Sequence, residues 1–549
     1  MNFEFKYVSS LEKIFPDQKE ITGEIKKLSA LRGETVSFQI AYRSDSPIWL
    51  TVETESEQVE VREVALAPSE FVVANEPGVL RDSPGLYPDP LLPIKEPLRM
   101  PPNQWRALWV TVRTFPEDMP GIKNITVKLS AKSLWENEPV EQVCSFPLEI
   151  LSAVMPEQKL IHTQWFHTDC IYTHYKVPCW SEEHWNLLEK YFRNFTAHGI
   201  NMLLTPLWTP PLDTKVDGER PTVQLLDIEY ENGAFSFDFT RLERWIDLAL
   251  KCGVKYFEMS HPFTQWGAKC CPKIMVNASG KKDKMFGWHT SSLSAEYVAF
   301  LRSLYPQLLA FLKEKGIAEK CYFHISDEPS PEHLENYKAC AKIIRELVGD
   351  LPVIDALSHV DFYLDGTVKH PIPANNMIED FVDAKVDPLW TYYCISQQKD
   401  VPNRFFNFPS YRNRIMGVLM YRYGVKGFLH WGYNFWFTQF SLKTDIDPFT
   451  CTDSGRAFCS GDAYLVYPGE NGPVDSIRGE ITFEAFQDCC ALQKLESLIG
   501  REKVLRMIHE GLDYELKMKQ YPRSSEWLLN LRERVNQAIN KALFSLQLF

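Results

Sequence analysis

The amino-acid sequence predicts a multidomain protein of α/β plus all-β class. We expect an N-terminal β-sandwich, then a (β/α)8 TIM-like barrel, then C-terminal helices packed on the barrel. Short β-branched runs separated by prolines fill the first part, strand-like runs alternate with amphipathic helices in the second, and the last part has helical periodicity. We place these parts at residues 1–155, 156–481 and 482–549, because a chain of 549 residues is long enough for several cores.

The first part is expected to be a sandwich because its apolar runs are short and alternate in polarity or are rich in β-branched residues. Thr35–Tyr42, Trp109–Val112 and Ile125–Leu129 are of this kind, and Phe146–Ile150 is the last such run. Short strands with proline-rich turns are typical of two packed antiparallel sheets. The prolines that interrupt the runs are Pro88, Pro90, Pro93, Pro97, Pro101 and Pro102.

The central part alternates strand and helix. A helix that begins at Ser181 and buries Trp185 is expected to end at Gly199. The connections 208–237 and 262–292 are long for such units and are typical of loops that build a site. Eight strands with intervening helices predict a (β/α)8 barrel. The strand candidates are residues 160–166, 202–206, 256–261, 321–325, 352–357, 389–394, 427–431 and 463–467.

Charge and hydropathy exclude several classes of partner. The net charge is −13, which disfavours nucleic acid and anionic membrane surfaces, so we expect neither. No stretch approaches the ~20 apolar residues of a membrane span. The chain begins Met1–Lys6 with no basic or apolar leader, so we expect a cytoplasmic protein unless a signal was removed. The sequence predicts no particular oligomeric state.

The cysteines indicate neither a disulfide scaffold nor a zinc ribbon. There are 13 of them, an odd and scattered set, and no C-x-x-C pair occurs. We therefore expect reduced and mostly buried thiols.

The most informative segment is His324–Pro331, where Asp327 and Glu328 are adjacent. They follow the apolar run Cys321–Ile325, which is typical of a buried strand, and Ser330 with Pro331 marks a helix start. Two acids at the carboxyl end of a barrel strand suggest sugar chemistry, because one can carry a proton while the other stays charged. The alternative interpretation is an acidic helix N-terminus that favours the helix dipole.

Because Asp327 and Glu328 are consecutive, their position in the chain limits the chemical roles that the two acids can take. Neighbouring residues of a strand point to opposite faces, so both acids can face one ligand only if the strand ends or kinks near Ser326. The pair need not have the ~5–5.5 Å spacing of an ordinary acid and nucleophile. Substrate-assisted chemistry suits it better: Asp327 would orient the 2-acetamido group of the sugar, and Glu328 would act as acid and then base. This chemistry requires no metal or cofactor, and we expect none.

Phe323–Pro329 resembles the signature of glycoside hydrolase family 123, as do Gly461–Gly469 and the following Ser476–Arg478. The predicted order of sandwich, barrel and helices is similar as well. The resemblance implies a retaining, exo-acting β-N-acetylgalactosaminidase with Asp327 assisting the acetamido group and Glu328 as acid/base. Its partner would be a glycan or oligosaccharide that ends in β-linked N-acetylgalactosamine.

Several aromatic and polar residues near predicted strand ends are candidates for substrate binding. Trp431 and Tyr433 could wall a sugar subsite, and Asn434 could bond a hydroxyl. We choose Tyr393 over Tyr392 as a donor to the acetamido carbonyl. Core packing or turn capping is the alternative at each position. We expect Arg478 to pair with a surface acid, and the alternative is that it reaches the barrel mouth. The complete set of binding candidates is His324, Trp390, Tyr393, Trp431, Tyr433 and Asn434.

Two other functions stay open. A hexosaminidase specific for another sugar, such as N-acetylglucosamine, differs in the recognition of one axial or equatorial hydroxyl. A non-catalytic glycan-binding protein could use the sandwich or an inactive barrel, although the intact acid pair argues against it.

Overall fold

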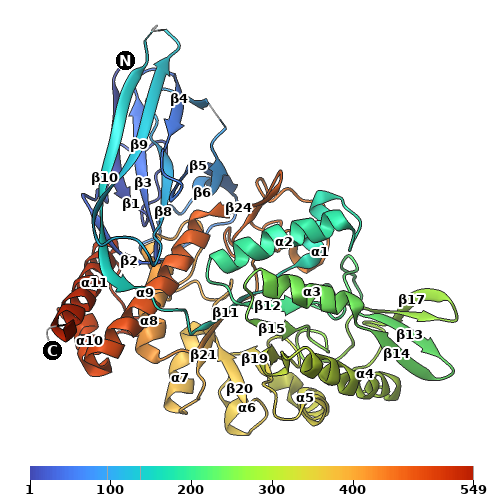
Figure 1. The fold of residues 1–549 in the computed structure, drawn as a ribbon. Coiled ribbons are helices and arrows are strands. Elements are labelled where there is room, and N and C mark those ends of the chain that lie inside the picture. The colour runs from blue at the N-terminus through green and yellow to red at the C-terminus, as the bar shows by residue number, and fades with distance from the viewer. Residues whose placement is uncertain (96, 136–137, 330, 548–549) are drawn as a thin grey trace.

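The computed structural model describes residues 1–95, 97–135, 138–329 and 331–547. A two-sheet β domain forms one end of the molecule, an α/β region forms the other, and helices α9 to α11 lie where the two meet (Figure 1). The mixed α/β and all-β class predicted from the sequence is confirmed.

Two sheets form the N-terminal β domain, and their facing side chains make its core. One sheet has the order β1-β3-β8-β5-β6-β24-β23, and the other β2-β10-β9-β4-β7. Phe38 and Phe146 stack between them with ring centroids 4.4 Å apart. The strands from this part of the chain are β1 Phe3–Ser9, β2 Leu28–Arg32, β3 Thr35–Ser44, β4 Ile48–Glu53, β5 Val59–Ser69, β6 Gly85–Pro93, β7 Leu98–Met100, β8 Arg106–Arg113, β9 Gly121–Ser133 and β10 Val140–Val154.

The far end of the chain completes one of these sheets. The hairpin of β23 Tyr467–Gly469 and β24 Gly472–Ser476 joins it, because Asp475 pairs with Leu91 and Ser476 with Pro90. Helix α9 then runs unbroken from Ile477 to Ile499, so the division proposed between residues 481 and 482 falls inside a helix.

The α/β region is organised around parallel strands. Six form a sheet in the order β18-β15-β12-β11-β22-β21, a half-barrel arrangement, and β19 pairs with β20 beside it. Single parallel bridges join Phe323 to Val353 and Ala374 to Tyr392. The strands are β11 Ile161–Gln164, β12 Met202–Thr205, β15 Tyr256–Met259, β18 Cys321–Tyr322, β19 Ile354–Leu357, β20 His370–Pro373, β21 Trp390–Tyr392 and β22 Gly427–His430.

Helices follow these strands along the chain. Helix α2 shows why they form: the Ser181 hydroxyl accepts from the amide of His184 at its start, Trp185 is buried, and Gly199 with φ of 71° ends it. The helices are α1 Thr168–Tyr175, α2 Glu182–Ala197, α3 Thr240–Lys251, α4 Ala295–Glu314, α5 Leu334–Val348, α6 Asp361–Leu364, α7 Ile378–Asp383, α8 Tyr411–Tyr423, α9 Ile477–Ile499, α10 Arg501–His509 and α11 Ser525–Gln547.

One predicted strand was wrong, and one was missed. Residues 463–467 do not join the parallel strands, and Tyr464 makes only an isolated antiparallel bridge to Asn434. The missed strand is β20, whose two prolines lower its apparent strand tendency. Its pairing with β19 is a tertiary feature that periodicity does not reveal.

The two long connections, residues 208–237 and 262–292, each contain loop segments and a pair of β-strands. Their strands form a four-stranded sheet that projects from the α/β region on the side away from the β domain (Figure 1). The remaining parts, before β13 and before β16, are loops. The sheet consists of β13 Asp227–Glu231, β14 Ala234–Asp238, β16 Ile274–Ala278 and β17 Lys281–Phe286.

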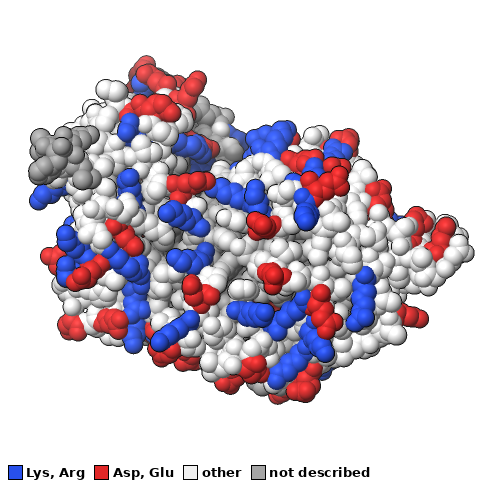
Figure 2. Space-filling model, turned by 60° about the horizontal axis from the view of Figure 1, so that its bottom comes forward, with Lys and Arg blue, Asp and Glu red and all other residues white. Residues whose placement is uncertain are grey.

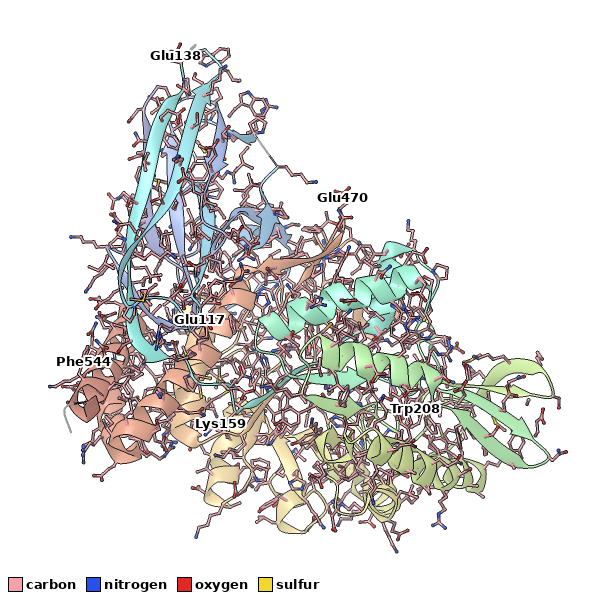
Figure 3. The ribbon with its side chains drawn as sticks, in the orientation of Figure 1. Glu117, Glu138, Lys159, Trp208, Glu470 and Phe544 are labelled. Atoms are coloured by element: carbon pink, nitrogen blue, oxygen red, sulfur yellow. The ribbon has the colours of Figure 1, made fainter. Side chains whose placement is uncertain are left out.

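The surface carries both signs of charge. Figure 2 shows Lys and Arg interspersed with Asp and Glu over one face, without a broad basic area. Glu138 lies at the far end of the β domain, whereas Trp208 lies within the α/β region (Figure 3), where its indole N–H donates to the carbonyl of His261 at 2.8 Å. Among the described residues, no helix is both long and apolar enough to cross a membrane.

Candidate active site

A cavity of about 220 Å³ brings Asp327 and Glu328 together. Its wall is formed by strand ends and by loops that are far apart in the sequence. Among the described residues that line it there are three carboxylates and no Lys, Arg or His. The lining residues are Trp165, Leu212, Asp213, Gln265, Trp266, Asp327, Glu328, Ala356, Tyr392, Cys394, Ile395, Leu429, Trp431, Gln439, Phe440 and Phe458.

The backbone leaves the strand before the acid pair, which lets both side chains reach one cavity. Strand β18 ends at Tyr322, and Glu328 adopts a left-handed conformation with φ of 43°. The amide of Trp266 donates to the carbonyl of Asp327 at 3.1 Å. A non-glycine residue held at positive φ is strained, and such strain gathers at functional sites. The expected cap Ser330 lies outside the described residues, and the helical turn that starts at Pro331 leads into α5.

The two acids differ in their surroundings. Asp327 is half-buried, and Glu328 is exposed. Burial and then the charge of Glu328 raise the pKa of Asp327 well above its usual range, whereas the charge of His324 opposes the rise. The hydroxyl of Tyr392 donates to Oε1 of Glu328 at 2.7 Å. Two neighbouring carboxyl groups in different surroundings, one half-buried and one fixed by a hydrogen bond, can take different roles in acid–base chemistry on a sugar.

A buried charged histidine, His324, lies just before the acid pair in the chain and is bound by two other carboxylates. His324 lies between Glu258 and Asp355, with Nε2 donating to Glu258 Oε1 at 2.5 Å and Nδ1 donating to Asp355 Oδ1 at 3.2 Å. Burial lowers its pKa, but the two carboxylates outweigh burial and raise the pKa to about 9. The indole N–H of Trp165 donates to Glu258 as well, at 2.7 Å. His324 therefore does not line the cavity as predicted for a binding residue, and it holds neighbouring groups in place.

Of the predicted binding residues, Trp431 lines the cavity. Its indole N–H donates to Oδ2 of Asp462 at 2.9 Å, which fixes the orientation of the ring. Burial raises the pKa of Asp462 to about 7, although the charge of Arg404 and this indole bond oppose the rise.

The other four candidates lie outside the lining. Trp390 is buried and packs where a side chain on Gly427 of the neighbouring strand would collide with it. The hydroxyl of Tyr393 donates to Asn413, and that of Tyr433 donates to Asn194 at 2.7 Å. Asn434 is fully buried and bonds both backbone polar groups of His167, so it is a structural cap.

The structure reverses the predicted choice of Tyr393 over Tyr392, because Tyr392 is the one that lines the cavity. Side chains alternate along β21, so Tyr392 and Cys394 reach the cavity while Tyr393 points into the packing against α8. The sequence alone did not show which of the two tyrosines faces inward, because residues 389–394 are all buried and large apolar side chains occur at both alternating positions.

Sequence reasoning missed most of the loop residues of the site. Asp213, Gln265 and Trp266 come from the two long connections, and Gln439 and Phe440 come from the loop after β22. The length of the connections was the available signal. It showed that loops build the site, but it did not show which side chains they contribute.

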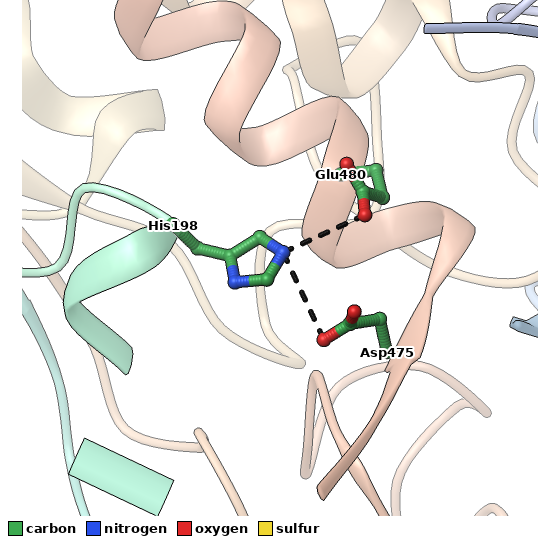
Figure 4. Close-up of side chains that lie close together, drawn as sticks. All are labelled: His198, Asp475 and Glu480. Atoms are coloured by element: carbon green, nitrogen blue, oxygen red, sulfur yellow. Dashed lines mark ion pairs between the residues drawn. The ribbon is translucent and has the colours of Figure 1, made fainter. Parts of the chain in front are cut away.

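A second cluster has the composition of a metal site but is already neutralised by arginine. Ligand atoms of His198, Asp475 and Glu480 lie within 4.8 Å of one another (Figure 4). The guanidinium of Arg62 donates to Asp475 and to Glu480, each at 2.5 Å. Asp475 and Glu480 raise the pKa of His198 to about 9 against the effect of burial, so it is charged too. A divalent cation would meet two positive groups, so these residues form an ion-pair cluster between the β domain and the α/β region.

Arg478 corrects another expectation. It is buried, not on the surface, and its guanidinium donates to both oxygens of Asp89 in β6 at 2.9 Å. It also donates to the carbonyl of Gly461 at 2.8 Å. The segments that carry the family resemblance near residues 461–478 thus fasten the β domain to the rest of the chain.

Comparison with known proteins identifies the family. The sequence model of the family "Glycoside hydrolase 123, catalytic domain" matches residues 165–495, more than half of the chain. The chain therefore belongs to glycoside hydrolase family 123 and is a glycosidase by class. Comparison with curated protein sequences gives no match.

Solved structures agree with the fold. A family 123 glycoside hydrolase from Clostridium perfringens, studied for glycolipid glycan hydrolysis, is similar with a TM-score of 0.72 and 15% identity over 100% of this chain and 98% of that chain. At this identity the similarity extends to the fold alone. A β-D-glucuronidase from Dictyoglomus thermophilum has a TM-score of 0.33 and 10% identity over 88% of this chain and 97% of its own, too low a score for inference.

Proposed function

We propose that this chain is a retaining exo-glycosidase that removes terminal β-linked N-acetylgalactosamine by substrate-assisted catalysis through the 2-acetamido group. The observation that carries the proposal is that Asp327 and Glu328, adjacent in sequence, line one cavity. A cavity of this size is of the order needed for one sugar ring.

Asp327 is assigned to the acetamido group. In the ligand-free protein its raised pKa favours its protonated form. An amide N–H from the substrate favours the carboxylate, because hydrogen bonding to the charged form lowers a pKa. The acetamido oxygen then attacks the anomeric carbon, and Asp327 stabilises the positive charge that develops on the resulting oxazolinium ring.

Glu328 is assigned to proton transfer. It donates a proton to the glycosidic oxygen as that bond breaks, and Tyr392 holds it in position. The resulting carboxylate takes a proton from water, whose oxygen attacks the anomeric carbon and reopens the ring. Two successive inversions retain the configuration, and the acetamido group is restored without a metal or cofactor.

We also propose that the parallel strands close as a (β/α)8 barrel. The two single bridges, Phe323 to Val353 and Ala374 to Tyr392, lie between the six-stranded sheet and the β19–β20 pair, which supports closure. A helix follows each of the eight parallel strands along the chain. The site would then lie where barrel enzymes carry it, at the carboxyl ends of the strands.

The substrate class proposed is an oligosaccharide such as the glycan of a glycolipid. The similar Clostridium perfringens protein was studied for glycolipid glycan hydrolysis, and this supports the proposed class. The aromatic lining by Trp165, Trp266 and Trp431 supports a sugar ligand, since such faces pack against the C–H side of a pyranose.

A panel of aryl glycosides tests the proposal. The β-N-acetylgalactosaminide should be cleaved, the matching β-galactoside without the acetamido group should be inert, and the product should keep the β configuration. Asp327→Asn and Glu328→Gln should each reduce kcat by roughly 10²–10⁴-fold. Glu335→Gln, at an exposed position of α5 outside the cavity, is the matched control.

Three results would contradict parts of the proposal. Faster cleavage of the N-acetylglucosaminide would reassign the sugar. Rapid cleavage of the plain galactoside would indicate a protein nucleophile. Sugar binding without hydrolysis, unchanged when both acids are replaced, would indicate a glycan-binding protein.

A further inference from the structure

The cavity contains a third carboxylate that the proposed mechanism does not use. Asp213, from the loop after β12, lines the cavity together with Asp327 and Glu328. It is half-buried, and its backbone is left-handed with φ of 40°. Because strain of this kind persists only where surrounding contacts enforce it, those contacts show how the residue is positioned.

A loop distant in sequence, the one after β22, holds Asp213 in place. The amide of Phe440 donates to Oδ2 of Asp213 at 2.9 Å, and the hydroxyl of Ser441 donates to its carbonyl at 2.8 Å. The amide of Lys215 donates back to the carbonyl of Phe440 at 3.1 Å. Phe440 and Ser441 are also at positive φ, 58° and 54°. The carboxylate is therefore pre-positioned by backbone groups and not by a partner cation.

Asp213 keeps capacity for a ligand. The part of the chain that the structure describes offers no hydrogen bond to its Oδ1 and no ion pair to its carboxylate within 4.0 Å. The charge of Arg220 lowers the pKa of Asp213, but its guanidinium is bound to both oxygens of Asp169, to which it donates at 2.9 and 2.8 Å. Burial raises the pKa of Asp213 to about 6, so it is mainly ionised at neutral pH. An ionised carboxylate only accepts hydrogen bonds, and sugar hydroxyls are suitable donors.

The negative charge of the cavity lining also favours an uncharged ligand over an anionic one. Asp213 and Asp327 line the same cavity, and the charge of Asp213 is one of the influences that raise the pKa of Asp327. No Lys, Arg or His is among the described lining residues. A sulfate, phosphate or carboxylate on the sugar would thus meet negative charge without a compensating cation.

We infer that Asp213 is a specificity-determining residue that accepts a hydroxyl of an uncharged N-acetylhexosamine and excludes sugars carrying anionic substituents. This inference rests on the proposed function, because it describes which sugar the same cavity admits. Three geometric observations support it. Oδ1 of Asp213 accepts no hydrogen bond from the described residues, and Phe440 and Ser441 hold the residue at positive φ. The described residues that line the cavity include no cation.

Kinetics on paired substrates test it. The wild-type protein should cleave an aryl β-N-acetylgalactosaminide at least a hundredfold more efficiently, by kcat/KM, than its 6-sulfate or 4-sulfate. Asp213→Asn should lower kcat/KM on the neutral substrate about tenfold, mainly through KM, because one charge-assisted bond is lost. The same change should reduce the preference for the neutral sugar at least tenfold. Asp217→Asn, at an exposed position of the same loop and outside the lining, should match wild type.

The outcomes separate the two proposals. If the wild-type protein cleaves no hexosaminide, the proposed function fails, and this inference fails with it. If it is active but cleaves neutral and sulfated sugars equally well, or if Asp213→Asn leaves the preference unchanged, only this inference is overturned. The wild-type comparison needs no variant, so misfolding of Asp213→Asn, which thermal unfolding would reveal, does not rescue the inference.

Discussion

Two groups of buried or half-buried acids differ in whether arginine accompanies them. In the cavity, Asp327 and Asp213 have no cation among the described lining residues, and burial raises the pKa of each. At the joint between the β domain and the α/β region, Asp475 and Glu480 share Arg62. The difference teaches that acids compensated by arginine hold this protein together, whereas uncompensated acids are available to a ligand.

The physical reason is the cost of desolvating a charge. A buried carboxylate is tolerated when a cation and hydrogen bonds replace water, as they do for Asp89 with Arg478. Asp213 and Asp327 lack such a partner, and the raised pKa of each marks a cost in the stability of the folded state. Such a cost is typical of functional sites, where stability is exchanged for chemistry.

The largest expected effect comes from a substitution in the cavity, which should reduce activity without reducing the stability of the fold. Asp327→Asn should abolish most activity while the free energy of unfolding stays equal or rises, because the change removes the cost of placing a carboxyl group in a half-buried position beside Glu328. Activity assays combined with denaturant unfolding measure both quantities. A fall in stability as large as that of a core substitution would break the comparison.

The joint should show the opposite pattern. Arg62→Met removes the guanidinium from Asp475 and Glu480 and leaves His198 to face both carboxylates, so the free energy of unfolding should fall by about 3–5 kcal/mol. KM for an aryl glycoside should not change, because Arg62 is not part of the cavity lining. Lys128→Gln, which removes an exposed ion pair with Glu55, is the control and should have a much smaller effect on unfolding. An unchanged free energy of unfolding for Arg62→Met would show that the joint is not held by charge.

His324 sharpens the comparison because it is a buried cation whose charge lowers the pKa of Asp327. His324→Gln removes the charge between Glu258 and Asp355, so we expect kcat to fall about tenfold or more through misplacement of the acid pair. KM should change less than kcat, and the pH dependence of kcat should shift. A variant that loses stability but keeps the wild-type kcat and pH profile would restrict His324 to a structural role.

The effect confined to the narrowest range of conditions is a pH dependence at the joint. The pKa of His198 is raised from 6.5 to about 9, so its stabilising contribution is complete below pH 6.5 and is lost as the pH rises through about 9. His198→Gln should therefore destabilise the protein by up to about 3 kcal/mol near pH 6, and by much less above about pH 9. Denaturant unfolding at the two pH values measures this difference. A deficit that is equal at both would exclude a charged His198.

The sequence by itself determined the class of the fold and the position of the acid pair. β-branched runs with prolines, helices that begin at residues such as Ser181, and the strand followed by Asp327 and Glu328 are local patterns. Local propensity and apolar periodicity act over a few residues, so one chain suffices to detect them. The order of the elements and the family resemblance follow from these patterns.

Only the tertiary structure decided which side chains meet. Tyr392 reaches the cavity and Tyr393 does not, because burial on both faces of β21 hides the inward parity from the sequence. Asp213 is positioned by Phe440, 227 residues away along the chain. Contacts of this kind depend on how strands and loops pack against one another, and that packing is set by the whole fold and not by the neighbours of a residue in the sequence.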